Sequence, residues 1–459
     1  MSTPTRVDAV VVGAGITGLV AARELALGGA SVALVDPAPV GGKLRTTAFD
    51  GGGLDEAADA FLARVPEGVD LCRALGIEGE LVSPTARRAY VWSGGALRLL
   101  PEAQVLGVPT DLDELAASGI VSPEGIARAG RDLAEPLASP SDDVAIGSLF
   151  RDRLGDEVVD RLVDPLVGGI NAGAVDALSL AATVPQLDAA ARSGAPSLIE
   201  ACRAQRAAVA DPSAPVFFAP RGGMGALVDA LVADVGRFGV EAIALGATQL
   251  ERDGADWVVE LSDGRRLAAE RVVLAGPAGV SGALVAPHAA RAGALLDAIP
   301  YASVALVALA VDRGSIDRAL DGSGFLVPRV EGRTITACSW TSSKWPHLHG
   351  AGTVWLRASV GRDGDAAALE RSDDALVDAV VADLGDTMAL VGPVTESRVT
   401  RWPGSFPQYR PGHLTRVDDI DADLAASAPG VVVAGSALRG LGIPACIRQA
   451  HAAVTRLLG

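Results

Sequence analysis

The sequence predicts a mixed architecture, in which a doubly wound α/β domain is combined with an α+β part. Three observations carry this prediction. An apolar, β-branched strand at residues 7–12 is followed by a glycine-rich turn, an alanine-rich helix through Leu27 and a second buried strand at residues 31–35. Segments with helical spacing then fill residues 101–210, before short strands return at residue 216. A last apolar strand at residues 430–435 leads into a C-terminal helix, so the α/β domain is discontinuous.

The first turn has the spacing of a dinucleotide-binding motif. Gly13, Gly15 and Gly18 fit G-x-G-x-x-G between a strand and a helix. In this Rossmann-type arrangement the first glycine permits the tight turn, the second lets the backbone approach a pyrophosphate, and the third allows close packing of helix on strand. Free N–H groups at the helix N-terminus favour the anion. Asp36 ends the second strand and could accept hydrogen bonds from a ribose 2′-OH, which argues against NADP.

A second glycine segment follows closely. Residues 39–47 read PVGGKLRTT, where Gly41 and Gly42 allow close backbone approach. Lys43 and Arg45 could meet phosphate or flavin ring oxygens, although an ordinary glycine turn with surface cations is the alternative. After Asp36, this segment favours FAD over NAD.

The C-terminal strand also meets glycines and then a helix. Residues 434–449 read AGSALRGLGIPACIRQ, and Pro444 suits the first turn of a helix that begins near Gly442. The dipole there could stabilise negative charge on a reduced flavin. An ordinary helix start is the other interpretation.

The remaining pattern predicts helices and strands around these motifs. Asp263 and Gly264 mark a hairpin turn. The expected helices span residues 122–135, with a cap-like start at Ser122, 148–163 and 373–384, and the expected strands span residues 257–261, 265–267, 271–275 and 302–311.

Composition sets further bounds. A chain of 459 residues is expected to form two or three domains, and its net charge of -17 argues against a nucleic-acid partner. The mutually distant cysteines form no metal or disulfide pattern, which suggests a reducing cytoplasm; they are Cys72, Cys202, Cys338 and Cys446. The spacing of His347 and His349 is poor for a metal site, so no metal is expected. No secretory signal or transmembrane run is expected, while peripheral membrane contact stays open.

Several segments carry a family resemblance. Besides the two glycine motifs, they are residues 59–64, 164–180, 220–227, 342–347, 402–413 and 440–447. On these segments the chain resembles, nearly end to end, the oxygen-dependent protoporphyrinogen and coproporphyrinogen oxidases of the amine-oxidase-like flavoprotein superfamily.

The resemblance implies FAD as cofactor and three domains. The FAD-binding domain would comprise residues 1–95, 216–298 and 410–459, the helical domain residues 96–215, and the substrate-binding sheet domain residues 299–409. It implies an oxidase of heme biosynthesis that converts a porphyrinogen, with coproporphyrinogen III preferred over protoporphyrinogen IX, to the porphyrin with O₂ as acceptor and H₂O₂ as product. A cytoplasmic location and transient contacts with neighbouring heme-pathway enzymes fit this role.

The resemblance and the motifs together nominate site residues. The cofactor set is Gly13, Ala14, Gly15, Ile16, Thr17, Gly18, Asp36, Pro37, Gly42, Lys43, Glu56, Ala57, Ala58, Asp59, Thr248, Trp402, Gly435, Gly442, Ile443 and Pro444. The substrate set is Arg64, Gly169, Ile170 and Asn171. Simpler interpretations are a solvated Arg64, a plain loop at residues 169–171 and a Trp402 that only packs.

The chain departs from the family at several of these positions. Ala57 and Ala58 replace a Gly-Pro turn, Val65 stands where relatives carry a base, and Asn171 where they often carry Tyr or Phe. No catalytic acid–base residue is assigned, because the flavin carries the chemistry. Two other functions stay open: another flavoprotein of the superfamily, such as an amine oxidase or carotenoid desaturase, or a non-catalytic FAD-bound scaffold.

Overall fold

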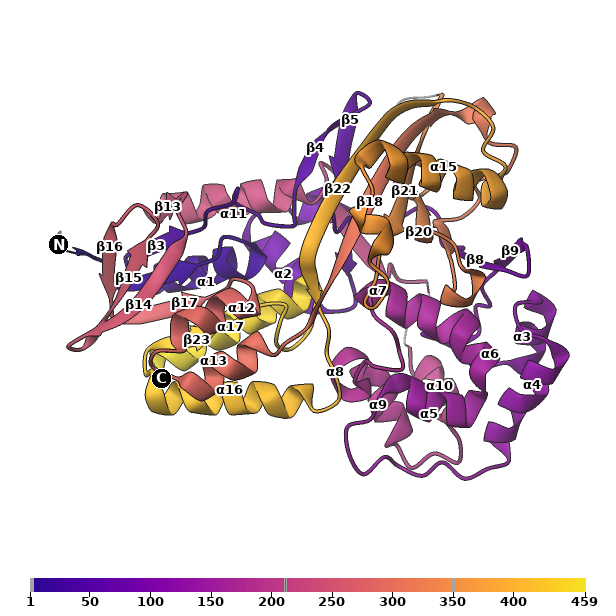
Figure 1. The fold of residues 1–459 in the computed structure, drawn as a ribbon, viewed down its shortest axis with the longest axis horizontal. Helices are drawn as coiled ribbons and strands as arrows, with labels where there is room; N and C mark the ends of the chain where they lie inside the picture. The colour runs from indigo at the N-terminus through magenta and orange to yellow at the C-terminus, as the bar shows by residue number, and fades with distance from the viewer. Residues whose placement is uncertain (1–3, 210, 212, 349–351) are drawn as a thin grey trace.

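A five-stranded parallel sheet forms one end of the molecule (Figure 1). The computed structural model describes residues 4–209, 211, 213–348 and 352–459, so His349 and the first three residues lie outside the described part. The sheet order is β13 (Glu241–Ile243), β3 (Val32–Val35), β2 (Ala9–Val12), β17 (Arg271–Leu274) and β23 (Val431–Val433). Its strands come from well-separated stretches of the chain, as a discontinuous domain requires.

Helices cover both faces of this sheet, as buried parallel strands require. One face packs against α1 (Ile16–Leu27), α11 (Gly225–Arg237) and α17 (Ile443–Leu458). The other packs against α12 (Ala278–Val285), α13 (Ala290–Asp297), α16 (His413–Ser427) and a smaller sheet of β1 (Thr5–Arg6), β16 (Arg266–Ala269), β15 (Asp256–Leu261) and β14 (Ala247–Asp253). The antiparallel β15–β16 pair confirms the hairpin predicted around Asp263.

A seven-stranded sheet forms a second layer (Figure 1). Its order is β22 (Val394–Pro407), β18 (Tyr301–Asp312), β21 (Thr353–Val360), β20 (Ile335–Trp340), β19 (Gly324–Leu326), β8 (Tyr90–Ser93) and β9 (Ala96–Leu99). Helix α15 (Asp373–Met388) packs on one face through Leu376, Val380 and Leu384. Strands β8 and β9 belong to this sheet, although the expected domain boundary at residue 95 falls between them.

A helical block lies against the β8–β9 end of that sheet. It comprises α3 (Leu112–Ser118), α4 (Pro123–Gly130), α5 (Ile146–Leu154), α6 (Asp156–Val158), a π-helix (Val159–Gly168), α7 (Gly169–Asn171), α8 (Leu180–Thr183), α9 (Pro185–Ala191) and α10 (Leu198–Ala207). Ser122 caps α4 as predicted, since its side chain accepts from the Gly125 N–H. That helix ends at Gly130, earlier than expected, and continues as the 3₁₀ turn Arg131–Leu133.

The single helix expected over residues 148–163 is wrong. Gly155 has φ 86° and ψ 163°, which no right-handed helix can contain, so α5 ends there and a new helical segment starts. That segment becomes the π-helix, which contains Pro165. Because π-turns often mark functional sites, the irregularity directs attention to the residues that follow it.

The shorter elements connect these layers. They are β4 (Thr46–Phe49), β5 (Gly52–Asp55), β6 (Phe61–Leu62), α2 (Pro66–Ala74), β7 (Leu81–Val82), β10 (Gln104–Val105), β11 (Val108–Pro109), β12 (Phe217–Pro220) and α14 (Thr341–Lys344). Within the described chain, no helix is long and apolar enough to cross a membrane. All four cysteines are buried and free, and no group of three or more metal-ligating side chains occurs among the residues described.

The contact between the first turn and α1 depends on Gly18. A Cβ at Gly18 would lie 1.7 Å from the Gly13 carbonyl oxygen, which is rigid backbone. We therefore expect Gly18→Ala to lower the free energy of unfolding by at least about 2 kcal/mol, as overpacking does. Gly236→Ala in α11 is the matched control, because a Cβ there meets nothing within 4 Å. Denaturant unfolding of both variants measures the difference, and equal stability would contradict this packing role.

Candidate active site

The two glycine turns lie side by side at the N-terminus of α1. The Gly41 N–H donates to the Ala14 carbonyl at 2.8 Å, and Gly15 and Gly41 form an isolated parallel bridge. A Cβ at Gly15 would meet nothing within 4 Å, whereas one at Gly42 would lie 3.4 Å from the Gly15 Cα. Open space over bare backbone at a helix N-terminus fits a pyrophosphate group.

Asp36 joins the second strand to the glycine turn. Its carboxylate accepts the Ala14 N–H at 2.6 Å and the Ala38 N–H at 2.8 Å. A carboxylate has further lone pairs, so these bonds leave it able to accept a ribose hydroxyl. Pro37 lies against Gly246, which follows β13. The predicted contact of Asp36 with ribose stays a prediction.

A second helix N-terminus converges on the first. Gly442 is the N-cap of α17, Ile443 begins it, and Pro444 lies in its first turn as predicted. The Cys446 thiol of α17 donates to the Leu441 carbonyl at 3.8 Å, and burial raises its pKa, an effect that the nearby Thr17 hydroxyl of α1 opposes. A Cβ on Gly435, whose φ is +129°, would lie 3.8 Å from the Thr17 Oγ1. Two helix dipoles therefore point into the crevice at the carboxyl ends of β2 and β23, where nucleotides bind such sheets.

The β4–β5 hairpin brings carboxylates to the same region. Asp55 accepts from the Thr46 hydroxyl at 2.5 Å and the Met224 N–H at 2.9 Å, and burial raises its pKa to about 6. Glu56 accepts from Arg45 at 2.9 Å and from the Thr47 hydroxyl at 2.8 Å. Glu56 Oε1 also lies 3.9 Å from Arg398 Nη1 of β22, so this carboxylate links the hairpin to that strand.

Trp402 is tied to this hairpin. Its indole N–H donates to the Glu56 carbonyl at 2.9 Å, and the Arg45 guanidinium lies 5.1 Å from the centre of its ring. The ring also packs against a small apolar cluster of Ala172, Ala302 and Val304, and Ala172 follows the predicted substrate segment. The predicted role of Trp402 at the flavin stays a prediction.

Asp59 is the centre of a partly buried ionic cluster. Its Oδ2 accepts from Lys344 at 2.8 Å and from the Trp345 indole and Arg357, each at 3.3 Å. Although burial opposes ionisation, Lys344 and Arg357 hold the pKa of Asp59 well below its usual value. Arg357 also donates to the Asp55 and Ala57 carbonyls, at 2.8 and 2.9 Å. The cluster therefore fixes the backbone of residues 55–59, whereas Ala58 packs into the neighbouring apolar core.

Lys43 crosses from the second glycine turn to strand β22. Its ammonium donates to the Ser405 carbonyl and lies 5.7 Å from the centre of the Phe406 ring. Burial lowers the pKa of Lys43. This cation between the glycine turn and β22 could meet phosphate or flavin oxygens, as expected from the sequence.

The segment Gly169, Ile170 and Asn171 forms a helical turn after the π-helix. Ile170 is 64% exposed, and a Cβ at Gly169 would meet nothing within 4 Å. Asn171 is buried, and its amide donates to the Val167 carbonyl at 2.7 Å. The backbone carbonyl of Asn171 accepts from the Gln408 side-chain amide at 2.9 Å. Gln408 is not among the site residues predicted from the sequence. The open face of this turn is therefore Gly169 and Ile170, while Asn171 holds its shape.

Two nominated residues lie apart from these contacts. Arg64 is exposed after β6, and the Thr248 hydroxyl donates to the Glu260 carbonyl at 3.1 Å along the β14–β15 pair. The solvated alternative for Arg64 agrees with its exposure. The roles of both residues stay predictions.

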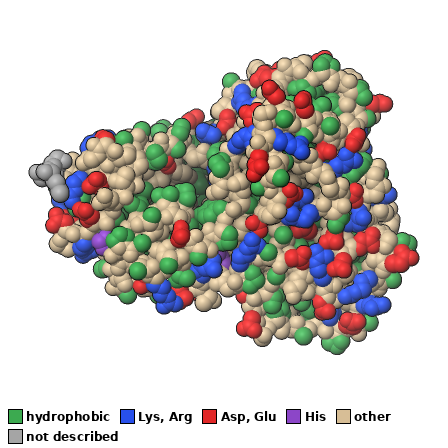
Figure 2. All heavy atoms as spheres, viewed as in Figure 1, with side chains coloured by type: hydrophobic (Ala, Val, Ile, Leu, Met, Phe, Trp, Pro, Cys, Tyr) green, Lys and Arg blue, Asp and Glu red, His purple; other side chains and the backbone are tan. Residues whose placement is uncertain are grey.

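Figure 2 shows a recess bordered by hydrophobic side chains between the part that carries α1 and α11 and the part that carries β22.

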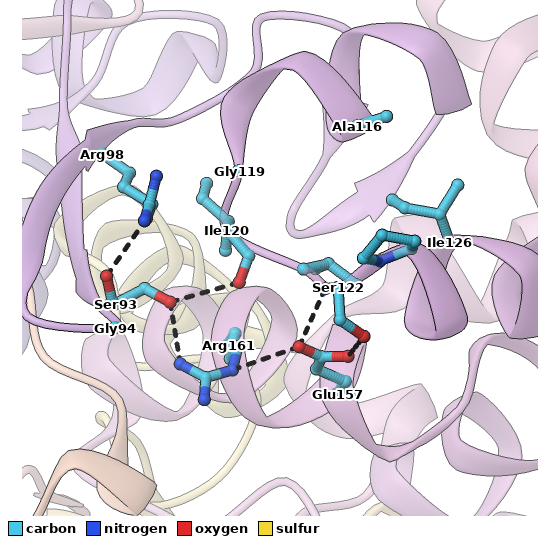
Figure 3. Close-up of a pocket in the computed structure, with 12 residues that line it drawn as sticks. Ser93, Gly94, Arg98, Ala116, Gly119, Ile120, Ser122, Ile126, Glu157 and Arg161 are labelled. Atoms are coloured by element: carbon cyan, nitrogen blue, oxygen red, sulfur yellow. Dashed lines mark hydrogen bonds and ion pairs between the residues drawn. The ribbon is translucent and has the colours of Figure 1, made fainter.

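A different cavity, of about 600 Å³, lies between the β8–β9 hairpin and α4 (Figure 3). Its polar side chains satisfy one another, since Arg161 donates to Ser93 at 2.7 Å and Ser122 donates to Glu157 at 2.6 Å. We therefore place the active site at the converging helices and not in this cavity.

Known proteins match the chain over nearly its full length. Residues 16–458 match the family described as flavin containing amine oxidoreductase. The chain is 35% identical to coproporphyrinogen III oxidase of Bacillus subtilis (strain 168), over 98% of this chain and 97% of that one. It is 27% identical to the chloroplastic protoporphyrinogen oxidase 1 of Arabidopsis thaliana, over 98% and 87%. A crystal structure from Exiguobacterium sp. 255-15 covers 100% of both chains with a TM-score of 0.88 and 29% identity.

Asp55 should make stability depend on pH. Its pKa rises from 3.8 in the unfolded chain to about 6 in the native state, so the native protein binds more protons between those values. Stability from this group is then greatest at low pH and is lost as pH rises through about 6. Relative to the parent, Asp55→Asn should gain up to about 3 kcal/mol between pH 4 and pH 7. Denaturant unfolding across that range measures it, and a pH-independent difference would contradict the raised pKa.

Proposed function

This chain belongs to the flavin containing amine oxidoreductase family, and from that premise we propose an FAD-dependent oxidase that converts coproporphyrinogen III to coproporphyrin III. O₂ is the acceptor, H₂O₂ the product and heme biosynthesis the setting. The observation that carries the proposal is the convergence of two helix N-termini on bare glycine backbone, in a chain related along its length to a coproporphyrinogen III oxidase.

The residues present fit FAD. The turn from Gly13 to Gly18 would hold the pyrophosphate, with Asp36 at the ribose. Lys43, Trp402 and the start of α17 would border the flavin ring. When bound, the flavin supplies the redox chemistry, since it accepts two electrons at a time from substrate and returns them to O₂.

The protein's own task is then positioning. Six electrons leave the macrocycle in total, so the substrate must present successive carbon centres to one fixed site. The Asp59 cluster and the Trp402–Glu56 bond hold the backbone that would border this site. Gly169 and Ile170 leave an open apolar surface on which a macrocycle could rest. No protein base is needed for this role.

An amine oxidase is the second candidate from this superfamily, and the aromatic residues argue against it. An aromatic cage would need two facing rings beside the flavin. Trp402 bonds to Glu56, whereas Tyr409 is 2% exposed, stacks on His413 at 4.1 Å and donates its hydroxyl to the Ser436 carbonyl at 2.5 Å. Tyr409 therefore does not face Trp402 across a cavity.

We also infer a cytoplasmic enzyme with transient contacts to its pathway neighbours. Free, buried cysteines are typical of a reducing compartment. An unstable porphyrinogen benefits from direct transfer between enzymes.

The purified protein should contain noncovalently bound FAD. Gly15→Val places a side chain in the space left for the pyrophosphate, while the surrounding atoms leave room for it, so the fold should persist. We expect the variant to lose FAD and its visible flavin absorbance, yet to keep the far-UV circular dichroism of the parent. FAD released by acid precipitation measures the content. A variant that binds FAD with near-parental affinity would contradict the assignment of the pyrophosphate.

The substrate preference is tested with two porphyrinogens at matched oxygen. We expect a higher kcat/KM for coproporphyrinogen III than for protoporphyrinogen IX, measured by porphyrin fluorescence, with H₂O₂ formed alongside. Propionate carboxylates must stay solvated or paired, because burying one without a partner is costly. An equal or reversed preference would overturn the substrate assignment, and only the assignment as a flavin-dependent oxidase would remain. A flavoprotein reduced by neither porphyrinogen would favour the non-catalytic scaffold.

A further inference from the structure

Two arginines lie behind the substrate turn, at one end of the seven-stranded sheet. Arg329 begins the 3₁₀ turn Arg329–Glu331 after β19, and this turn packs on the π-helix. Arg362 follows the end of β21. The neighbouring Asp363 N–H donates to the Ala172 carbonyl at 2.7 Å, so the Arg362 loop is bonded directly to the turn that presents Gly169 and Ile170.

Neither guanidinium has all its donors paired with residues that the structure describes. Arg362 is buried, with a side chain 9% exposed, and its ion pair with Asp365 is long, at 3.5 Å through Nε. Its terminal amino groups form no hydrogen bond with the residues that the structure describes. Arg329 forms no hydrogen bond or ion pair within the same described ranges, and its Nη2 is buried without a partner.

Both arginines also lie near the carboxylate of Asp164 in the π-helix, whose negative charge opposes theirs. Asp164 accepts the Val175 N–H at 3.1 Å, and burial raises its pKa. Burial lowers the pKa of Arg362, and repulsion by Arg329 adds to that effect. Arg329 borders the π-helix through its 3₁₀ turn, Arg362 borders α7 through the Asp363–Ala172 bond, and both keep donors that no described residue accepts. An external anion would complete this arrangement.

We infer that Arg329 and Arg362 form a carboxylate subsite, which holds one propionate of the porphyrinogen. The inference rests on the proposed function. Two guanidinium forks match a carboxylate in shape and charge. The turn between them and Trp402 exposes the surface proposed for the macrocycle.

The same subsite would discriminate between porphyrinogens. Coproporphyrinogen III carries a propionate on each pyrrole ring, whereas protoporphyrinogen IX carries vinyl groups on two of them. Coproporphyrinogen III therefore fills the subsite in every orientation, whereas protoporphyrinogen IX leaves both guanidinium groups unpaired in the orientations that place a vinyl group there. Sites built to pair a polar substrate group reject analogues that lack it more strongly than apolar pockets do.

The test measures binding of the product, coproporphyrin III, and of its tetramethyl ester to the FAD-loaded protein. Arg329→Gln should weaken binding of the free acid by about tenfold or more, because charge-assisted hydrogen bonds are lost. Binding of the ester should be unchanged. In turnover it should raise KM for coproporphyrinogen III with little change in kcat. Arg329→Lys should recover part of the affinity, because it keeps the charge and loses the fork.

Arg265→Gln is the matched control. It removes one positive charge from an exposed arginine that pairs with Asp263 on the β15–β16 turn, so both ligands should bind as in the parent. Unchanged binding of the free acid by Arg329→Gln, or equal loss for acid and ester, would overturn the subsite. If Arg329→Gln weakens binding of inorganic phosphate but leaves binding of both porphyrins unchanged, the pair binds a free anion, and the subsite is also overturned. A parent protein that oxidises neither porphyrinogen would instead overturn the proposed function.

Discussion

The partly buried ionic cluster at Asp59 joins the nucleotide-binding sheet region to the second sheet. Arg357 comes from β21, Lys344 and Trp345 from the segment after β20, and Asp59 from the chain that leaves the β4–β5 hairpin. These charged side chains are only 13–18% exposed, so removing one of them would leave the remaining charges poorly solvated. The Nη1 group of Arg357 also donates to the Asp55 and Ala57 carbonyls. Two sheets that share no strand are thereby held in one geometry around the proposed flavin.

This constraint explains why the crevice can be built from distant parts of the chain. Helices α1 and α17 pack against each other, and Ile16 and Ile443 at their first turns share one apolar core. The sheet beneath them supplies the close approach, since Gly18 brings α1 onto the Gly13 carbonyl. On the other side of the proposed flavin site, the Asp59 cluster and the Trp402 indole hold the backbone of residues 55–59 in place. Each contact alone is modest, but together they leave the backbone N–H groups preorganised for an anion before a cofactor arrives.

The sequence predicted best those features that depend on local backbone. The roles of Gly13 and Gly18 follow from turn geometry, and the hairpin at Asp263 from its turn residues, so both could be predicted. The break at Gly155 could not, because the flanking spacing is helical on both sides. Arg357 and Gln408 act through contacts with residues some 240 to 300 positions away, and no local pattern marks them. The departures at Ala57 and Ala58 are accommodated because Arg357, rather than a Gly-Pro turn, holds the backbone there.

The negative net charge of the protein makes Arg329 and Arg362 important for binding an acidic substrate. A protein with a net charge of -17 repels a substrate that carries several carboxylates, and this repulsion acts before any contact forms. Long-range attraction therefore cannot gather the substrate, and recognition has to come from cations at short range. Most arginines of the described chain are already paired with carboxylates, as Arg151 is with Asp156, Asp160 and Asp176. Arg329 has no ion pair among the described residues, and Arg362 has only a 3.5 Å contact with Asp365, so both keep donors near the substrate turn. In an acidic enzyme with an acidic substrate, recognition at short range requires cations with available donors where the substrate carboxylates bind.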